Sequence, residues 1–138
     1  MRLDDATCWA KLRAADHGVL ATVHAARGVD AVPVVFAVVG RGIVVPVDAV
    51  KPKRHARLQR LTNIGIDPRC VLLVEEYADD WSTLWWVRVH GRAEVVEPDG
   101  DAVAALAARY PAYDRPGAIT SALLLVPDAL SGWAASPK

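Results

Sequence analysis

A basic run that joins an apolar segment to a predicted helix is the part of this sequence best suited to binding a ligand. Residues 48–60 read DAVKPKRHARLQR and contain five of the sixteen Lys and Arg residues of the chain. Pro52 suits the first turn of a helix, because a backbone N–H at that position has no partner within the helix. Free N–H groups and the positive end of the helix dipole attract anions. The run therefore predicts a site for a phosphate group.

The basic residues of this run are expected to differ in their roles. Lys51 and Lys53 flank the predicted start of the helix, where the donors converge, so we expect them to hold the phosphate as mobile point charges. For Arg54 and Arg57, binding of the phosphate and a place on the solvated face of the helix are both open. Arg60 is expected to lie on a solvated face of the helix.

The second candidate for a functional role is Trp86, which lies in an alternating segment, Leu84–Val96. Alternation of apolar and polar residues predicts a long strand with one face toward the core. Trp85 falls on the apolar face, so burial in the core explains it. Trp86 falls on the opposite face together with Arg88, and it needs cover from a partner subunit, a ligand ring or a loop. For Trp81, in the polar loop that precedes this strand, a functional and a structural role are both open.

The other reactive residue types form no pattern that indicates a catalytic centre. The four histidines, at 17, 24, 55 and 90, have neither the spacing nor the nearby carboxylates of a zinc site. Cys8 and Cys70 are too few for a disulfide framework, and we expect them to be buried in a reducing cytoplasm. No motif marks an activated nucleophile. If the protein is an enzyme, its chemistry is therefore expected to come from a cofactor.

Length and composition indicate one globular domain over residues 1–138. The chain is 53% hydrophobic and 23% charged, with sixteen basic and sixteen acidic residues. A neutral net charge argues against nucleic-acid binding as the main role. No secretory signal or membrane span is predicted, so we expect a cytoplasmic protein. Four acidic residues lie close together in the sequence, at Glu75, Glu76, Asp79 and Asp80. Ion pairs between these residues and the basic run would give the run a structural role in place of ligand binding.

Short links between the predicted strands favour an antiparallel barrel with peripheral helices, that is, a mainly β (α+β) fold. Pro33 suggests an edge strand or a bulge, and Gly91 suggests a bend or a bulge. The Gly-x-Gly-x-x-Gly fingerprint of dinucleotide-binding Rossmann folds does not occur in the sequence, so a Rossmann site is not expected. Helices are predicted from Asp4 to about Ala15, from Pro52 to about Ile64 and from Asp99 to about Tyr110. Strands are predicted at Gly18–His24, Ala31–Val39, Ile43–Val47, Cys70–Glu76, Leu84–Val96 and Thr120–Val126.

Four segments resemble a known family. They read GVLATV at 18–23, VPVVF at 32–36, DAVKPKR at 48–54 with 58–64, and DWSTLWWVRVHGR at 80–92. The segments 110–113 and 132–134 resemble the same group. On these residues the chain is similar to the pyridoxamine-phosphate-oxidase-like split β-barrels. It looks closest to the actinobacterial group described as probable deazaflavin (coenzyme F420)-dependent enzymes.

The resemblance implies a six-stranded antiparallel split β-barrel that forms a homodimer with two cofactor sites at the subunit interface. It assigns the cofactor phosphate to the basic run and the ring to the ends of two strands, with the partner subunit closing the site. True pyridoxamine-phosphate oxidases carry a phosphate-site pattern that is missing here, which argues against vitamin B6 oxidation. The implied cofactor residues are Lys51 and Lys53 with Arg54 and Arg57 for the phosphate, Pro33, Val34, Val35, Val47 and Asp48 for the ring, and Trp86 and Arg88 for closure.

The resemblance implies hydride transfer between coenzyme F420 and an unsaturated or carbonyl-like small molecule. The alternatives are an FMN-binding oxidoreductase, and a non-catalytic flavin- or haem-binding protein of the same fold. A haem-binding variant would have to use His55 or His90. A non-enzymatic anion-binding module that contacts nucleic acid is a further alternative, which neutral charge disfavours. The catalytic residue, the proton donor and the substrate are not assigned by the sequence.

Overall fold

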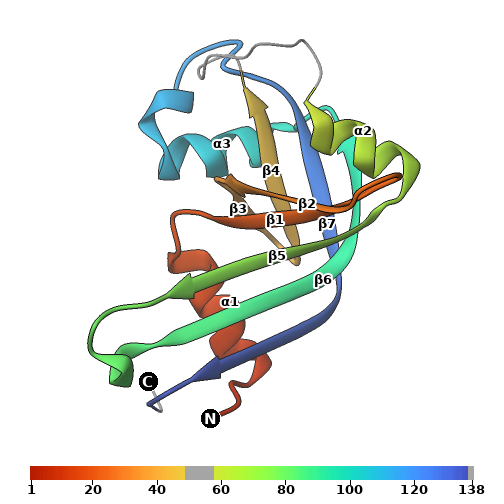
Figure 1. The fold of residues 1–138 in the computed structure, drawn as a ribbon. Helices are drawn as coiled ribbons and strands as arrows, with labels where there is room; N and C mark the ends of the chain where they lie inside the picture. The colour runs from red at the N-terminus through yellow and green to blue at the C-terminus, as the bar shows by residue number, and fades with distance from the viewer. Residues whose placement is uncertain (49–57, 137–138) are drawn as a thin grey trace.

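The computed structural model describes residues 1–48 and 58–136 (Figure 1). Two single-turn 3-10 helices, Trp81–Thr83 and Pro111–Tyr113, supplement the main elements. No helix in this part of the chain is long and apolar enough to cross a membrane. The main elements are, in order, α1 (Asp5–Ala14), β1 (Gly18–His24), β2 (Gly28–Val34), β3 (Ala37–Val39), β4 (Gly42–Asp48), α2 (Gln59–Ile66), β5 (Arg69–Glu76), β6 (Trp85–Val96), α3 (Gly100–Arg109) and β7 (Ile119–Ala134).

The strands form one antiparallel sheet of seven strands in the order β2-β1-β5-β6-β7-β4-β3. The sheet curls without closing, and the three helices lie around it (Figure 1). This confirms the mainly β split-barrel class with peripheral helices. The number of strands is seven instead of six, because the apolar run 31–39 is divided between β2 and β3 at opposite ends of the sheet. Pro33 lies in the edge strand β2, as predicted.

The division of this run has a clear cause at Phe36, which belongs to neither strand. Its N–H donates to the hydroxyl of Tyr110 at 3.3 Å, and its carbonyl accepts from the Arg109 guanidinium at 2.7 Å. The end of α3 thus replaces the ladder partners of this peptide, which satisfies its buried polar groups. The chain therefore stops pairing with β1 after Val34 and starts pairing with β4 at Ala37.

The alternation in β6 is confirmed. Val87, Val89, Gly91 and Ala93 are buried, whereas the intervening Arg88, His90, Arg92 and Glu94 are exposed. Val95 was expected on the apolar face but is exposed, and Val96 packs instead against a second apolar cluster beneath α3. The main core lies inside the curled sheet and includes residues of α1 and α2.

A bulge lies between β6 and β7, as Gly91 suggested. His90 pairs with Ala129 and Gly91 pairs with Pro127, so Asp128 is the extra residue. The bulge lets β7 accommodate Pro127, which removes a ladder donor, and continue to Ala134. The predicted end of this strand at Val126 was therefore wrong.

The helix starts were predicted with mixed success. Asp4 caps α1 by accepting from the Thr7 N–H at 2.8 Å, and Asp99 caps α3. Leu58 has an extended backbone and packs against the core, so the helix that ends at Ile66 begins at Gln59. A single helix from Pro52 to Ile64 is therefore excluded.

We predict that Gly91→Ala destabilises the fold by about 1–3 kcal/mol, a cost typical of overpacking. A Cβ at this position would clash with the carbonyl oxygen of Val126, which is backbone and cannot move aside easily. Gly100→Ala is the control, because nothing lies within 4 Å of its Cβ position. Urea denaturation of both variants measures the difference, and equal midpoints would contradict this account of the bulge.

Candidate functional site

The predicted ring site lies where β2 and β4 end. Val34 and Val47 are buried in the same core cluster, with exposed fractions of 4% and 5%, so they offer a ligand only their backbone groups. Pro33 is exposed and Val35 is partly buried. Val35 lies between the last residue of β2 and the first residue of β3, outside both ladders. Its peptide groups are therefore not assigned to the ladder of either strand.

The predicted phosphate clamp lies largely outside the described residues. This applies to Lys51, Lys53, Arg54 and Arg57, and to the side chain of Asp48, whose backbone ends β4. The structure therefore places the end of one ring-site strand directly before the basic run, and the start of α2 directly after it.

Arg60 differs from its prediction. It lies in the first turn of α2, where it is partly buried and its Nε is shielded from solvent. Arg60 stands four residues before the buried Ile64, and residues four apart lie on the same side of a helix. That spacing could have indicated partial burial from the sequence. The first turn of α2 thus carries a positive charge close to the core.

The convex side of the sheet carries many apolar side chains, with Glu75, Arg88 and His90 in the same cross-strand rows. Cross-strand pairing aligns Pro33 with Val19, Val19 with Leu73, and Leu73 with Arg88. Strands lie about 4.8 Å apart, so Pro33 and Arg88 lie about 14 Å apart on the same face. We call this surface the outer apolar face. Its members are Val19, Ala21, Val29, Pro33, Val71, Leu73, Trp86 and Trp133.

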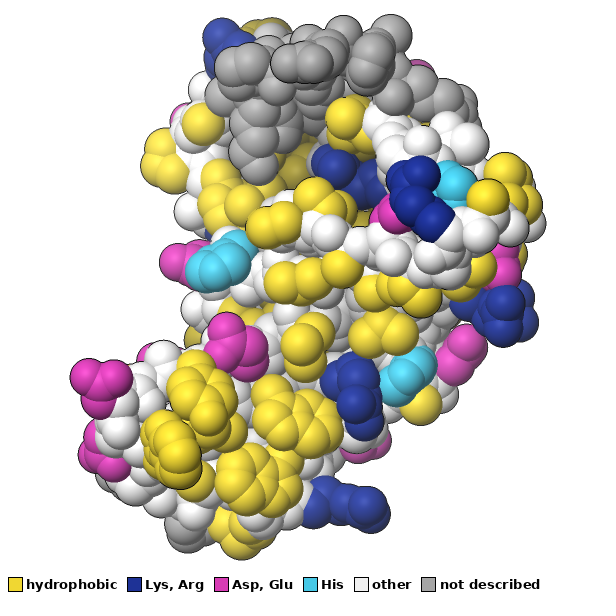
Figure 2. Space-filling model, in the orientation of Figure 1, with side chains coloured by type: hydrophobic (Ala, Val, Ile, Leu, Met, Phe, Trp, Pro, Cys, Tyr) yellow, Lys and Arg dark blue, Asp and Glu magenta, His cyan; other side chains and the backbone are white. Residues whose placement is uncertain are grey.

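Trp86 lies on the outer apolar face and is only partly covered by its own chain. It stands opposite Trp133, which is 39% exposed, and the Arg88 guanidinium lies 4.9 Å from the centre of its ring. Trp81, in the preceding loop, is 68% exposed, so this residue does not bury the face. Figure 2 shows large hydrophobic side chains gathered over the lower ends of β5, β6 and β7. This aromatic surface is the largest group of exposed ring side chains in the described part of the chain, and exposed apolar patches are typical of surfaces that bind a partner or a ligand.

Trp85 has the structural role predicted for it. Its ring packs against the main core, and its Nε1 donates to Glu76 at 3.0 Å. The ammonium group of Lys11 lies 4.4 Å from the centre of the ring, a cation–π contact. Trp85 and Trp86 thus lie on opposite faces of β6, as the alternation requires.

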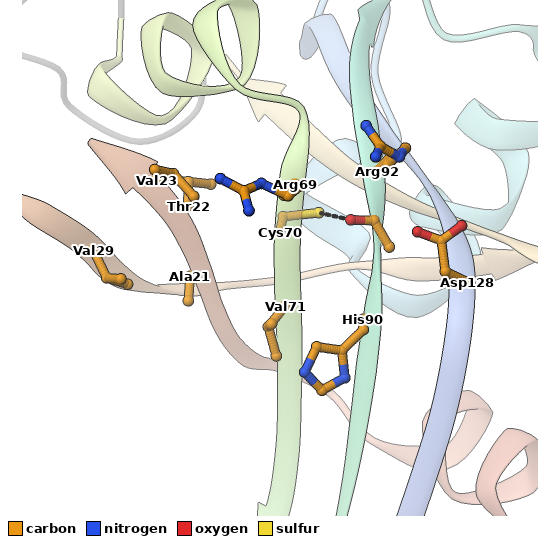
Figure 3. Close-up of a pocket in the computed structure, with 11 residues that line it drawn as sticks. Ala21, Thr22, Val23, Val29, Arg69, Cys70, Val71, His90, Arg92 and Asp128 are labelled. Atoms are coloured by element: carbon orange, nitrogen blue, oxygen red, sulfur yellow. Dashed lines mark hydrogen bonds between the residues drawn. The ribbon is translucent and has the colours of Figure 1, made fainter. Parts of the chain in front are cut away.

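A hollow of about 330 Å³ lies beside the bulge on the convex side (Figure 3). Its charged side chains extend in different directions, and Arg69 is held by Asp67 at 2.7 Å. This contact lowers the pKa of Asp67 to about 2. The Cys70 thiol faces the carbonyl of Gly91 at 3.7 Å, and burial raises its pKa to about 11. The hollow therefore has an apolar wall but no group activated for nucleophilic attack. No pattern in the sequence had indicated this hollow.

The comparisons with known proteins agree with this architecture. A family model described as pyridoxamine 5'-phosphate oxidase matches residues 4–133. The conserved hypothetical protein Rv2991 from Mycobacterium tuberculosis is 21% identical, with a TM-score of 0.78 over 96% of this chain and 86% of that chain. The FAD binding protein from Mycobacterium smegmatis is 17% identical, with a TM-score of 0.67 over 96% and 97% of the two chains. An FAD-binding protein from Mesorhizobium loti is 19% identical, with a TM-score of 0.70 over 96% and 93%. The search of curated proteins gave no match.

We predict that neither cysteine reacts with Ellman's reagent at neutral pH while the protein is folded. Cys8 and Cys70 are 0% and 5% exposed, and burial raises the pKa of both thiols. The same protein unfolded in guanidinium should release colour for two thiols, which provides the control. Rapid reaction of a thiol in the folded state would show that Cys70 is an accessible group of the hollow.

Proposed function

The chain belongs to the pyridoxamine 5'-phosphate oxidase family, and from this premise we propose that it binds a flavin-type cofactor and acts as an oxidoreductase on a small molecule. The observation that carries the proposal is the family match over residues 4–133, which includes both ring-site strands and the basic run. Two structures of the same fold, from Mycobacterium smegmatis and Mesorhizobium loti, are described as FAD-binding proteins. When bound, the cofactor supplies hydride transfer.

The residues at the ends of β2 and β4 fit such a cofactor. Pro33 and Val35 offer an apolar contact and free-standing peptide groups beside the ring, while Lys51 and Lys53 would hold the phosphate, with Arg54 and Arg57 as helpers. Val34, Val47 and Asp48 would contribute through the backbone that shapes this edge. The partly buried Arg60 adds positive charge in the first turn of α2. This division, with an apolar edge for a ring and cations for a phosphate, is the arrangement that a phosphorylated flavin or deazaflavin requires.

Coenzyme F420 is the cofactor that we favour over FMN. The preference rests on the likeness of the segments 48–54 and 80–92 to the deazaflavin-dependent group. A substrate that is apolar and unsaturated or carbonyl-like suits the valine, proline and tryptophan residues around the proposed site. The chain's own residues would bind, orient and shield the reacting molecules from water.

A non-catalytic flavin carrier with FMN or FAD is the second candidate. Two relatives in fold are described as FAD-binding without a stated reaction. The hollow near Cys70 supplies no activated nucleophile, which is also compatible with storage of a cofactor. Turnover of a reduced deazaflavin or flavin with small unsaturated acceptors would separate the enzyme from the carrier.

We further propose a homodimer that buries the outer apolar face. Val19 is 38% exposed, Leu73 is 37% exposed and Val29 is 66% exposed, which is a costly arrangement for a sheet face left in water. A second copy packed on this face would meet the same apolar rows, as a two-fold interface requires. Trp86 and Arg88 lie three strands from Pro33 within one subunit. Packing face to face would bring Trp86 and Arg88 of the partner subunit toward Pro33.

We predict that Lys53→Ala weakens cofactor binding several-fold and leaves the oligomeric state unchanged. The variant removes one of the two cations proposed to hold the phosphate. Arg41→Ala is the control, because Arg41 is an exposed cation in the turn between β3 and β4. Fluorescence titration of each variant with F420 and with FMN measures the dissociation constants. Micromolar binding of neither cofactor by the wild-type protein would refute the proposed function.

We predict that Leu73→Glu converts the dimer into monomers by placing a charge in the centre of the outer apolar face. Val103→Glu, on α3, is the matched control, because Val103 and Leu73 are both 37% exposed. It should leave the dimer intact. Sedimentation equilibrium gives the mass of each species. A monomeric wild-type protein, or equal dissociation of the two variants, would contradict this interface.

A further inference from the structure

The hollow beside the bulge has an apolar wall on one side and charged side chains on the other (Figure 3). The wall comes from β1, β2 and β5, whereas Arg92 and Asp128 come from β6 and β7. The volume of about 330 Å³ lies at the lower end of the range for ligand pockets, about 300–1,000 Å³. The hollow therefore suits a small molecule with an apolar part and a charged end. The apolar wall consists of Ala21, Val23, Val29 and Val71.

The charged side chains around the hollow favour an anion. Arg69, Arg92 and His90 are basic, and Asp128, the extra residue of the bulge, is acidic. Arg92 is exposed and forms no hydrogen bond or ion pair with another residue in the part of the chain that the structure describes. Its guanidinium group is therefore available to a ligand.

Arg92 also stands directly opposite Arg69 of β5 in the sheet. Like charges at such positions repel each other and destabilise the pairing of the strands. Asp67 offsets Arg69, whose terminal nitrogen donates to its carboxylate at 2.7 Å. These hydrogen bonds are the main cause of the lowered pKa of Asp67, whereas the charge of Arg92 has the smallest effect on it. The charge of Arg92 thus remains largely uncompensated beside an apolar wall.

We propose that the hollow binds a small apolar carboxylic acid, with the guanidinium of Arg92 donating to the carboxylate and the tail lying on the apolar wall. The planar fork of a guanidinium matches the two oxygens of a carboxylate. The wall disfavours a fully hydrated anion such as inorganic phosphate, because such an ion gains nothing from apolar contacts and loses water. The proposal involves no cofactor, so it is independent of the proposed function. It is compatible with the proposed dimer, since a flat partner face would span a depression without filling it.

Titration of the isotope-labelled protein with hexanoate, followed by NMR of the backbone amides, tests this proposal. Hexanoate should shift the amide signals of β1, β5 and β6 around the hollow. Hexanol and hexylamine carry the same tail with a neutral and a positive end. We expect hexanoate to bind about tenfold more tightly than hexanol, the scale of a hydrogen bond to a charged group. Hexylamine should bind more weakly than both, because Arg92 repels a cation.

Three variants separate the contributions of the charge and of the wall. Arg92→Gln should weaken hexanoate about tenfold and leave hexanol unchanged, because only hydrogen bonds to the carboxylate are lost. Ala21→Leu should weaken both ligands, since the larger side chain takes up part of the hollow. Asp128→Asn should tighten hexanoate by removing a negative charge from the lining. Arg41→Gln is the matched control, because Arg41 is an exposed cation in the turn between β3 and β4, outside the hollow.

Equal affinities for hexanoate and hexanol would overturn the proposal, as would an Arg92→Gln variant that behaves like Arg41→Gln. Amide shifts confined to another part of the protein, or the absence of hexanoate binding, would overturn it as well. None of these results bears on the proposed cofactor, whose binding is measured separately with F420 and FMN.

Discussion

The separation of β2 from β3 is the constraint on which the rest of the structure depends. The peptide of Phe36 is held by Tyr110 and Arg109, so the chain stops pairing with β1 and starts pairing with β4. This single exchange puts two consecutive strands at opposite ends of one sheet. It leaves Val35 outside both ladders and leaves Pro33 on the convex side. An unbroken strand over 31–39 would have used these peptide groups in a ladder and closed the edge where the ring site is proposed.

The local parts of the fold could be predicted from the sequence, because their causes are local. Alternation over 84–96 fixed the two faces of β6, and Asp4 and Asp99 marked the starts of two helices. The division of the run 31–39 depends on Arg109 and Tyr110, which lie far away in the sequence, and a valine-rich run contains no sign of it. The length of β7 was missed for a similar reason, since Pro127 is accommodated by a bulge that involves β6.

Some residues of the candidate site were placed correctly from the sequence, and others were not. Alternation placed Trp86 and Arg88 away from the core, and this is what the structure shows. Val34 and Val47 lie in nearly unbroken apolar runs, and the structure buries both, so their role at a ring can only be a backbone role. Arg60 was misplaced because charge was weighed without its spacing to Ile64. The hydrogen bonds that join Asn63 to Thr22 and Asp30 had no signal in the sequence, since these residues come from three elements that meet only in the fold.

Two kinds of interaction fix β4 and α2, the two elements on either side of the basic run in the sequence. The proposed ring site is set by the ends of β2 and β4, whose buried valines belong to the main apolar core. The orientation of α2 is fixed in addition by hydrogen bonds from Asn63 to Thr22 of β1 and to the carboxylate of Asp30 of β2. Apolar cores tolerate exchange among side chains of similar volume, whereas a polar network loses its geometry when one member is removed. Substitutions in the core are therefore expected to alter stability, whereas loss of Asn63 or Thr22 is expected to alter the orientation of α2. The orientation of α2 thus depends on a few named atoms, whereas the ends of β2 and β4 depend on many apolar contacts.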